Sequence, residues 1–232
     1  MIENKKDVYF LSGTMCNEKL WQEVFALSSS INPIYIDTTA GSSFEEISRI
    51  IDSKIKEDAI LVGFSMGAFA ALRYTIFHPR KVSKLILLAV DSEGLNAKEI
   101  ELRKSTIHFL EKHPYKGVAS SRIKQFLHPD HFKHQYMVDV IKEMDRDLGK
   151  EVLLRQLTAT SFRDSLTDKL DRIKIPTLLL SGDSDALISS DKMELMKNKI
   201  EDAIHIKIEN SGHMLPLEQP MEVIYSIEDF IE

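Results

Sequence analysis

The chain of 232 residues contains a single cysteine, Cys16. One thiol cannot form a disulfide within the chain, so a disulfide-stabilised fold is excluded and a reducing compartment is indicated. No apolar run approaches the length that spans a membrane, and the opening residues contain no apolar segment typical of a secretion signal. We therefore expect a cytoplasmic protein without a membrane partner.

The sequence also lacks a strong excess of charge of one sign. The 30 Lys and Arg residues and 36 Asp and Glu residues give a net charge of −6, without a basic block or stripe. We therefore expect no nucleic-acid partner. The chain also lacks Gly-x-Gly-x-x-Gly and any Gly-rich loop that carries the lysine needed to bind phosphates. We expect no cofactor.

Three histidines, His128, His131 and His134, raise the question of a metal site. Residues three apart share one face of a helix, but residues six apart largely do not, so the three side chains would not converge from one helix. A helix start at Pro129 with solvated polar neighbours explains the segment better. We expect no metal.

The chain does contain a regular alternation of short apolar runs and helical patterns. Near-continuous apolar runs that alternate with helices indicate a parallel sheet covered on both faces. The predicted fold class is α/β, with a mostly parallel, doubly wound sheet of about six strands. The strands are predicted at residues 8–11, 34–36, 60–62, 85–90, 175–183 and 204–208.

The alternation stops between residues 94 and 164, where only helical periodicity is present. We interpret this segment as several helices inserted between two strands of one sheet. Residues 1–93 and 165–232 would then form the core, and residues 94–164 a helical cap that makes one structural unit with it.

The functional prediction rests on Gly-Phe-Ser-Met-Gly at residues 63–67, which lies between an apolar strand and a helix-favouring run. In that context Gly-x-Ser-x-Gly is a nucleophile elbow, a sharp turn that strains the backbone of Ser65 and exposes its Oγ. The position at a helix N-terminus also favours a developing negative charge. Alone, the pentapeptide also fits a small-residue turn that packs a helix close to a strand, although the nucleophile elbow is favoured.

A serine nucleophile needs a base, and the base needs a third group that orients it. With a nucleophile elbow the chain order is Ser, acid, His, on loops after later strands. His213 follows the last predicted strand, and Asp185 follows the strand before it. Asp183 and Asp91 also stand at strand ends and are alternatives for the acid, but the loop position favours Asp185.

Two backbone amides should stabilise an oxyanion next to the nucleophile. One is the amide of Met66, the residue after Ser65. The other should come from the loop at residues 12–15, and Thr14 is the best candidate. Cys16 lies beside this loop, and we interpret it as a small buried apolar side chain and not as a reactive thiol.

These motifs, together with Gly-x-x-Asp at 182–185 and Gly-His-x-x-x-x-Glu-x-Pro at 212–220, resemble the α/β-hydrolase superfamily across almost the whole chain. The chain is more narrowly similar to small esterase-like members related to enol-lactone hydrolases and the pimeloyl-carrier-protein methyl esterase. Their first loop is echoed at residues 12–21, and their Arg-Gln-x-x-Ala motif at 155–159. Ser12 departs from their usual His or Pro. The resemblance implies an α/β-hydrolase fold with a helical cap over the active site.

We expect a serine hydrolase that cleaves a small carboxylic ester, thioester or lactone through an acyl-enzyme, with a small-molecule ester as its only predicted partner. Two alternatives stay open: the same triad acting as a base in elimination or carbon–carbon cleavage, and a signalling protein that senses a small molecule. The sequence carries no signal for an oligomeric state. The residues predicted to contact substrate are Met15, Phe162, Arg163 and Met214. For Arg163, contact with a substrate carboxylate competes with an ion pair to Asp164 or Asp168.

Overall fold

A computed structural model describes residues 5–232. Residues 1–4, which belong to the predicted core and to the opening segment that lacks a secretion signal, lie outside the described residues. Its centre is a six-stranded, all-parallel sheet in the order β2-β1-β3-β4-β5-β6. The strands are β1 Lys6–Leu11, β2 Ile31–Tyr35, β3 Ala59–Phe64, β4 Val82–Leu88, β5 Thr177–Gly182 and β6 Ala203–Ile208.

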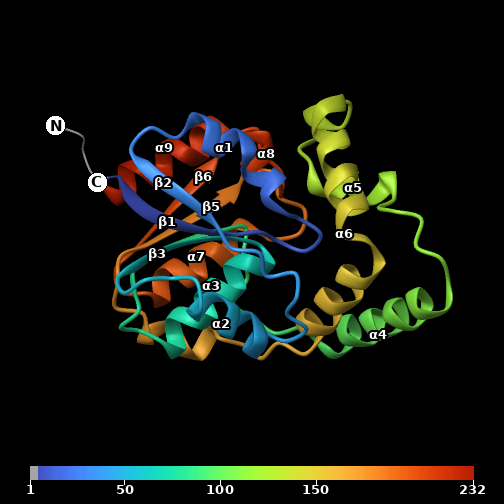
Figure 1. Cartoon of the computed structure of the whole chain (residues 1–232), viewed down its shortest axis with the longest axis horizontal. Coiled ribbons are helices and arrows are strands. Elements are labelled where there is room, and N and C mark those ends of the chain that lie inside the picture. The colour runs from blue at the N-terminus through green and yellow to red at the C-terminus, as the bar shows by residue number, and fades with distance from the viewer. Residues whose placement is uncertain (1–4) are drawn as a thin grey trace.

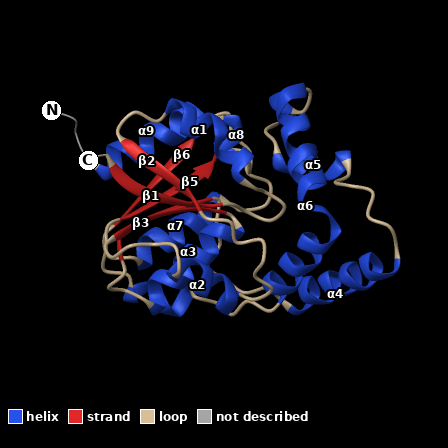
Figure 2. Cartoon of the chain, viewed as in Figure 1, coloured by secondary structure: helices blue, strands red, loops and turns tan. Residues whose placement is uncertain are grey.

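Helices cover both faces of this sheet, as Figures 1 and 2 show. On one face lie α1 Gln22–Leu27, α8 Leu215–Glu218 and α9 Pro220–Ile231; on the other lie α2 Phe44–Asp52, α3 Met66–Phe77 and α7 Ser190–Lys199. Short 3-10 helices precede α1 (Glu18–Trp21) and β5 (Thr167–Arg172). The central strands β1, β3, β4 and β5 are largely apolar because helices cover both of their faces, whereas the edge strand β6 exposes Ile204 and Ile206.

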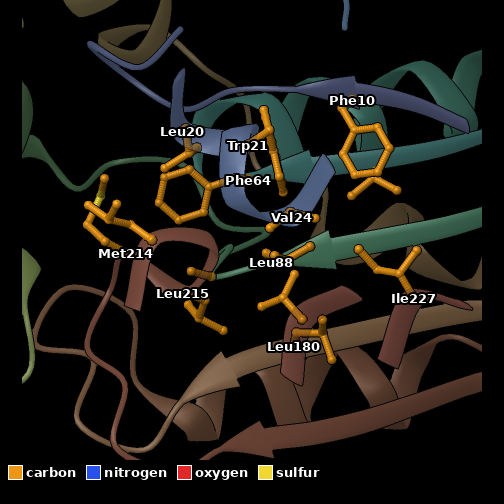
Figure 3. Close-up of a cluster of buried hydrophobic side chains, with 14 of the residues drawn as sticks. Phe10, Leu20, Trp21, Val24, Phe64, Leu88, Leu180, Met214, Leu215 and Ile227 are labelled. Carbon is orange, nitrogen blue, oxygen red and sulfur yellow. The ribbon is translucent and has the colours of Figure 1, made fainter. Parts of the chain in front are cut away.

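The apolar core is divided by the sheet into two clusters. Figure 3 shows part of the cluster on the α1/α9 face, where Phe10 and Leu88 of the sheet meet Trp21 and Ile227 of the covering helices. The Phe10 and Trp21 ring centres are 5.0 Å apart in an edge-to-face arrangement, which adds to the stabilisation from burial alone.

Between β4 and β5 the chain forms a group of helices beside the carboxyl ends of the strands (Figure 1). They are α4 Ala97–Lys112, α5 Ser120–Phe126, a 3-10 turn at Pro129–His131 and α6 Gln135–Ser161. Helix α6 is kinked at Gly149, whose φ of 68° only glycine adopts readily. No helix among residues 5–232 combines the length and apolarity needed to cross a membrane.

Strand β2 begins at Ile31, three residues before the predicted start, and contains Pro33. A proline cannot donate to a sheet, so it argues against a strand in the interior. Here β2 is an edge strand, and Pro33 is tolerated because only one side of the strand is paired.

Candidate active site

The turn between β3 and α3 holds Ser65 in a strained conformation, with φ 52° and ψ −112°. Its amide donates to the carbonyl of Leu88 on the neighbouring strand at 2.9 Å, which fixes the turn to the sheet. A Cβ atom on Gly67 would lie 2.5 Å from the carbonyl oxygen of Ser12, so only glycine fits there. The strain is maintained by this close packing, and it leaves the Ser65 side chain only partly buried.

The structure brings the three predicted catalytic residues together. Nε2 of His213 lies 3.2 Å from Oγ of Ser65, and Nδ1 lies 2.8 Å from Oδ2 of Asp185. The other carboxylate oxygen of Asp185 accepts the amides of Leu187 at 2.8 Å and Ile188 at 3.0 Å. The Asp185 side chain is only 1% exposed, so these bonds replace water and fix the carboxylate toward the imidazole.

The two alternative acids have other partners. Asp183 accepts the amides of Asn210 at 3.1 Å and Ser211 at 3.2 Å, and so braces the loop that carries His213. Burial raises the pKa of Asp183, but these hydrogen bonds outweigh it and hold the pKa below its usual value. Asp91 forms an ion pair with Lys192. Neither carboxylate is bonded to the imidazole.

The loop after β1 lies directly against the nucleophile turn. A Cβ on Gly13 would come within 3.1 Å of the Cβ of Ser65, which sets the next residue, Thr14, beside the nucleophile. Met66 is the first residue of α3, where a helix amide has no partner within its own helix. These are the two amides predicted to bind an oxyanion, and the loops that carry them are in contact.

Gln156 in α6 holds this loop from the cap side, a contact that the sequence analysis does not identify. Its Oε1 accepts the amide of Met15 at 2.8 Å, and the residue is only 1% exposed. Met15 has a φ of 56°, an unfavourable region for a side chain of its type. The bond therefore stabilises a strained residue next to Thr14. The motif at 155–159 contains Gln156 but gives no indication of its partner.

Glu218 is a second residue that the sequence analysis does not assign. Its Oε1 accepts the amides of Gly212 at 2.9 Å and Met214 at 3.1 Å, which flank His213. Its Oε2 accepts the amide of His128 at 2.6 Å and lies 2.9 Å from Nδ1 of His131. One buried carboxylate therefore connects the histidine loop to the start of the cap's 3-10 turn.

The cap also contacts the histidine loop through its backbone. The carbonyl of Phe126, at the end of α5, accepts the amide of His213 at 2.7 Å. A Cβ on Gly212 would lie 2.6 Å from the amide nitrogen of His128, so the two backbones touch. The position of the His213 imidazole thus depends on the cap.

The four residues predicted to contact substrate have different environments. Phe162 is 63% exposed, whereas Met214 is buried at 3%. Arg163 forms no ion pair with Asp164 or Asp168; its guanidinium stacks on the ring of Phe69, with Cζ 4.7 Å from the ring centre. Phe162 and Arg163 both line a cavity of about 280 Å³. Met15 donates its backbone amide to Gln156.

Cys16 is 6% exposed, and burial raises the pKa of its thiol to about 12. At neutral pH the side chain therefore stays protonated and unreactive. Of the three histidines considered for a metal, His131 faces Glu218, and Nδ1 of His128 accepts the amide of Asp130. Within residues 5–232 no cluster of three or more His, Cys, Asp or Glu side chains has the geometry to hold a metal ion.

Comparison with known proteins identifies the family of the chain. A model of the Ndr family matches residues 39–232. Monoacylglycerol lipase ABHD6 of Homo sapiens is 23% identical over 259 residues, covering 98% of this chain and 76% of that protein. The pimeloyl acyl-carrier-protein methyl ester esterase of Aromatoleum aromaticum is 23% identical over 262 residues, covering 98% of this chain and 99% of that protein.

Among solved structures, a thermophilic esterase from Thermogutta terrifontis superimposes with a TM-score of 0.86 at 19% identity, over 97% of this chain and 89% of that one. The predicted α/β-hydrolase fold, with its six-stranded parallel sheet, is confirmed.

Proposed function

The chain belongs to the Ndr family of α/β-hydrolases, and from that premise we propose that it is a serine hydrolase that cleaves small carboxylic esters, thioesters or lactones. The observation that carries the proposal is the continuous hydrogen-bonded series from Asp185 through His213 to Ser65. Two relatives support the substrate class, because their names describe a monoacylglycerol lipase and a methyl ester esterase, both acting on carboxylic esters.

The chemistry follows from the roles of the three side chains. The imidazole of His213 takes the hydroxyl proton as Ser65 Oγ attacks the ester carbonyl, and Asp185 stabilises the imidazolium that forms. The amides of Thr14 and Met66 bind the oxyanion of the tetrahedral intermediate. His213 then protonates the leaving alcohol, and an acyl group remains on Ser65. Water, activated by the same imidazole, releases the acid and restores the serine.

Replacing Ser65 with Ala tests this mechanism. We expect the wild type to hydrolyse short 4-nitrophenyl esters and to be labelled by a fluorophosphonate probe, and the Ser65→Ala variant to lose both, with turnover reduced by about 10⁶-fold. Ser92, a buried hydroxyl bonded to Thr167, gives a matched control, since Ser92→Ala should be labelled normally. Hydrolysis that persists in Ser65→Ala would refute the proposal.

Mass spectrometry of the wild type during turnover separates hydrolysis from the use of the triad as a base. An acyl group bound to Ser65 is expected for an acyl-enzyme mechanism. Turnover without any such adduct in samples quenched during the steady state would favour elimination or carbon–carbon cleavage.

A further inference from the structure

Three arginines from three segments next to the active site lack carboxylate partners. Arg103 lies in α4, Arg122 in α5 and Arg163 just after α6. The hydrogen-bond acceptors that the described residues offer them are neutral: the Thr160 hydroxyl for Arg103 at 2.7 Å and the Gln125 amide oxygen for Arg122 at 2.6 Å. The buried Nε of Arg163 has no partner at all within residues 5–232.

Two of these guanidinium groups lie over aromatic rings that belong to segments adjoining Ser65 and His213. The Arg163 group stacks on Phe69, whose amide donates to the carbonyl of Ser65. The Arg122 group lies over Phe126, with Cζ 4.9 Å from the ring centre, and that ring is 6.4 Å from the ring of His213. The Arg122 charge is therefore one aromatic ring from His213, and the Arg163 charge lies against the first turn of α3, the helix that begins directly after Ser65.

Arg103 approaches the same region through the oxyanion loop. The Thr160 hydroxyl that accepts from Arg103 donates to the carbonyl of Gln156, the residue that holds Met15. Arg103 is also close enough to Arg122 and to Arg163 for the like charges to repel. The three groups thus gather around one region between the cap helices and the catalytic residues.

This arrangement is unfavourable for the fold by itself. Arg103 and Arg163 are half-buried and Arg122 is exposed, and burial lowers the pKa of each guanidinium. The nearest carboxylates are already engaged, since Glu99 closes the capping box of α4 and Asp91 pairs with Lys192. Partly desolvated like charges without counter-ions are destabilising, and groups held in this way mark candidate binding sites.

We propose that these three arginines form an anion subsite, which binds a carboxylate or phosphate carried by the substrate while its ester carbonyl lies at Ser65. The planar fork of a guanidinium matches either oxyanion with two parallel hydrogen bonds. The inference rests on the proposed hydrolase function and adds the substrate class: an ester whose acyl or alcohol part ends in an acidic group.

The first test compares two esters of matched chain length, mono-4-nitrophenyl adipate and 4-nitrophenyl hexanoate. We expect kcat/KM of the wild type to favour the acidic ester by tenfold or more, in the range of a charge-assisted hydrogen bond. Arg103→Gln should remove about tenfold of that preference, measured as the ratio of kcat/KM for the two esters. Arg103→Lys should keep part of the preference, since it retains the charge without the fork.

Arg80→Gln is the matched control, because Arg80 is an exposed arginine in the turn before β4. It should leave the ratio between the two esters unchanged. Equal rates for the two esters in the wild type, or a parallel loss of both in Arg103→Gln, would overturn the proposal.

The second test measures binding without turnover and so separates the subsite from the hydrolase proposal. Ser65→Ala is titrated calorimetrically with monomethyl adipate, methyl hexanoate and hexyl phosphate, with and without Arg103→Gln. We expect the acidic ligands alone to bind, and Arg103→Gln to weaken them about tenfold. Tighter binding of the adipate identifies a carboxylate subsite, and tighter binding of the phosphate identifies a phosphate subsite. If neither monomethyl adipate nor hexyl phosphate binds, the subsite is refuted even if the enzyme hydrolyses neutral esters. If the acidic ligands bind but the wild type hydrolyses no ester, only the catalytic proposal is refuted.

Discussion

Glu218→Gln should weaken both the fold and the catalysis, because the NH₂ group of the new side chain is a hydrogen-bond donor and the groups around Glu218 are mostly donors as well. The carboxylate of Glu218 faces two backbone amides on one oxygen, and an amide and the His131 ring on the other. The best orientation of the new side chain puts its NH₂ toward His131, whose Nδ1 can accept, and leaves the amide of His128 unpaired. One buried unpaired amide costs about 1–3 kcal/mol, and the remaining bonds lose their charge assistance.

We therefore expect the free energy of unfolding to fall by about 2–4 kcal/mol, measured by urea denaturation. The amides on both sides of His213 are then held by a neutral acceptor in place of a charged one, so kcat should fall by roughly 10- to 100-fold with the neutral ester, given the sensitivity of catalysis to small misplacements. Glu222→Gln is the control: Glu222 is exposed in α9, and its change should stay within about 0.5 kcal/mol. A Glu218→Gln variant as stable and as active as the wild type would contradict the role assigned to this carboxylate.

Two further predictions concern the loops at the active site. Gln156→Met removes the acceptor of the Met15 amide at nearly constant volume. It should lower kcat by roughly 10- to 100-fold with little change in KM, because the oxyanion loop acts in the transition state. An unchanged kcat in steady-state kinetics would show that the loop keeps its conformation without this hydrogen bond. Asp183→Asn should be less stable than the wild type at pH 7, and the difference should shrink as the pH falls below the unperturbed value of 3.8. The stability difference shrinks in acid because a carboxyl whose pKa is lowered by folding contributes stability only while it is ionised. Urea denaturation that gives the same difference in unfolding free energy at pH 7 and in acid would be inconsistent with this role of Asp183.

The features predicted from the sequence are those with a local pattern. The turn at Ser65 is encoded within five residues, and Asp185 and His213 each directly follow a buried strand, where residues of parallel strands meet at one edge of the sheet. The fold class follows from the alternation of apolar runs and helices, which is local as well. Strand β2 was predicted too short because Pro33 interrupts its apolar run, and only the strand order reveals that it lies at an edge.

The supporting residues could not be predicted in the same way. The bond from Gln156 to Met15 joins residues 141 apart, and the bond from Glu218 to His128 joins residues 90 apart. Neither contact has a periodic pattern, and a glutamate is expected on the surface unless a buried partner is known. The arginine group could not be predicted either, since it brings together three segments and depends on the neighbouring acids Asp91 and Glu99 having other partners.

The link between Phe126 and His213 also orders events during synthesis of the chain. The sheet grows outward from β1, with β3, β4, β5 and β6 each added beside the one before. Ser65 therefore leaves the ribosome 148 residues before His213, and the cap segment that receives the histidine loop is also made first. A nascent chain that ends before His213 contains Ser65 but not the imidazole proposed to take its proton. We therefore expect reactivity only after the His213 loop has docked on the cap, which is synthesised before it.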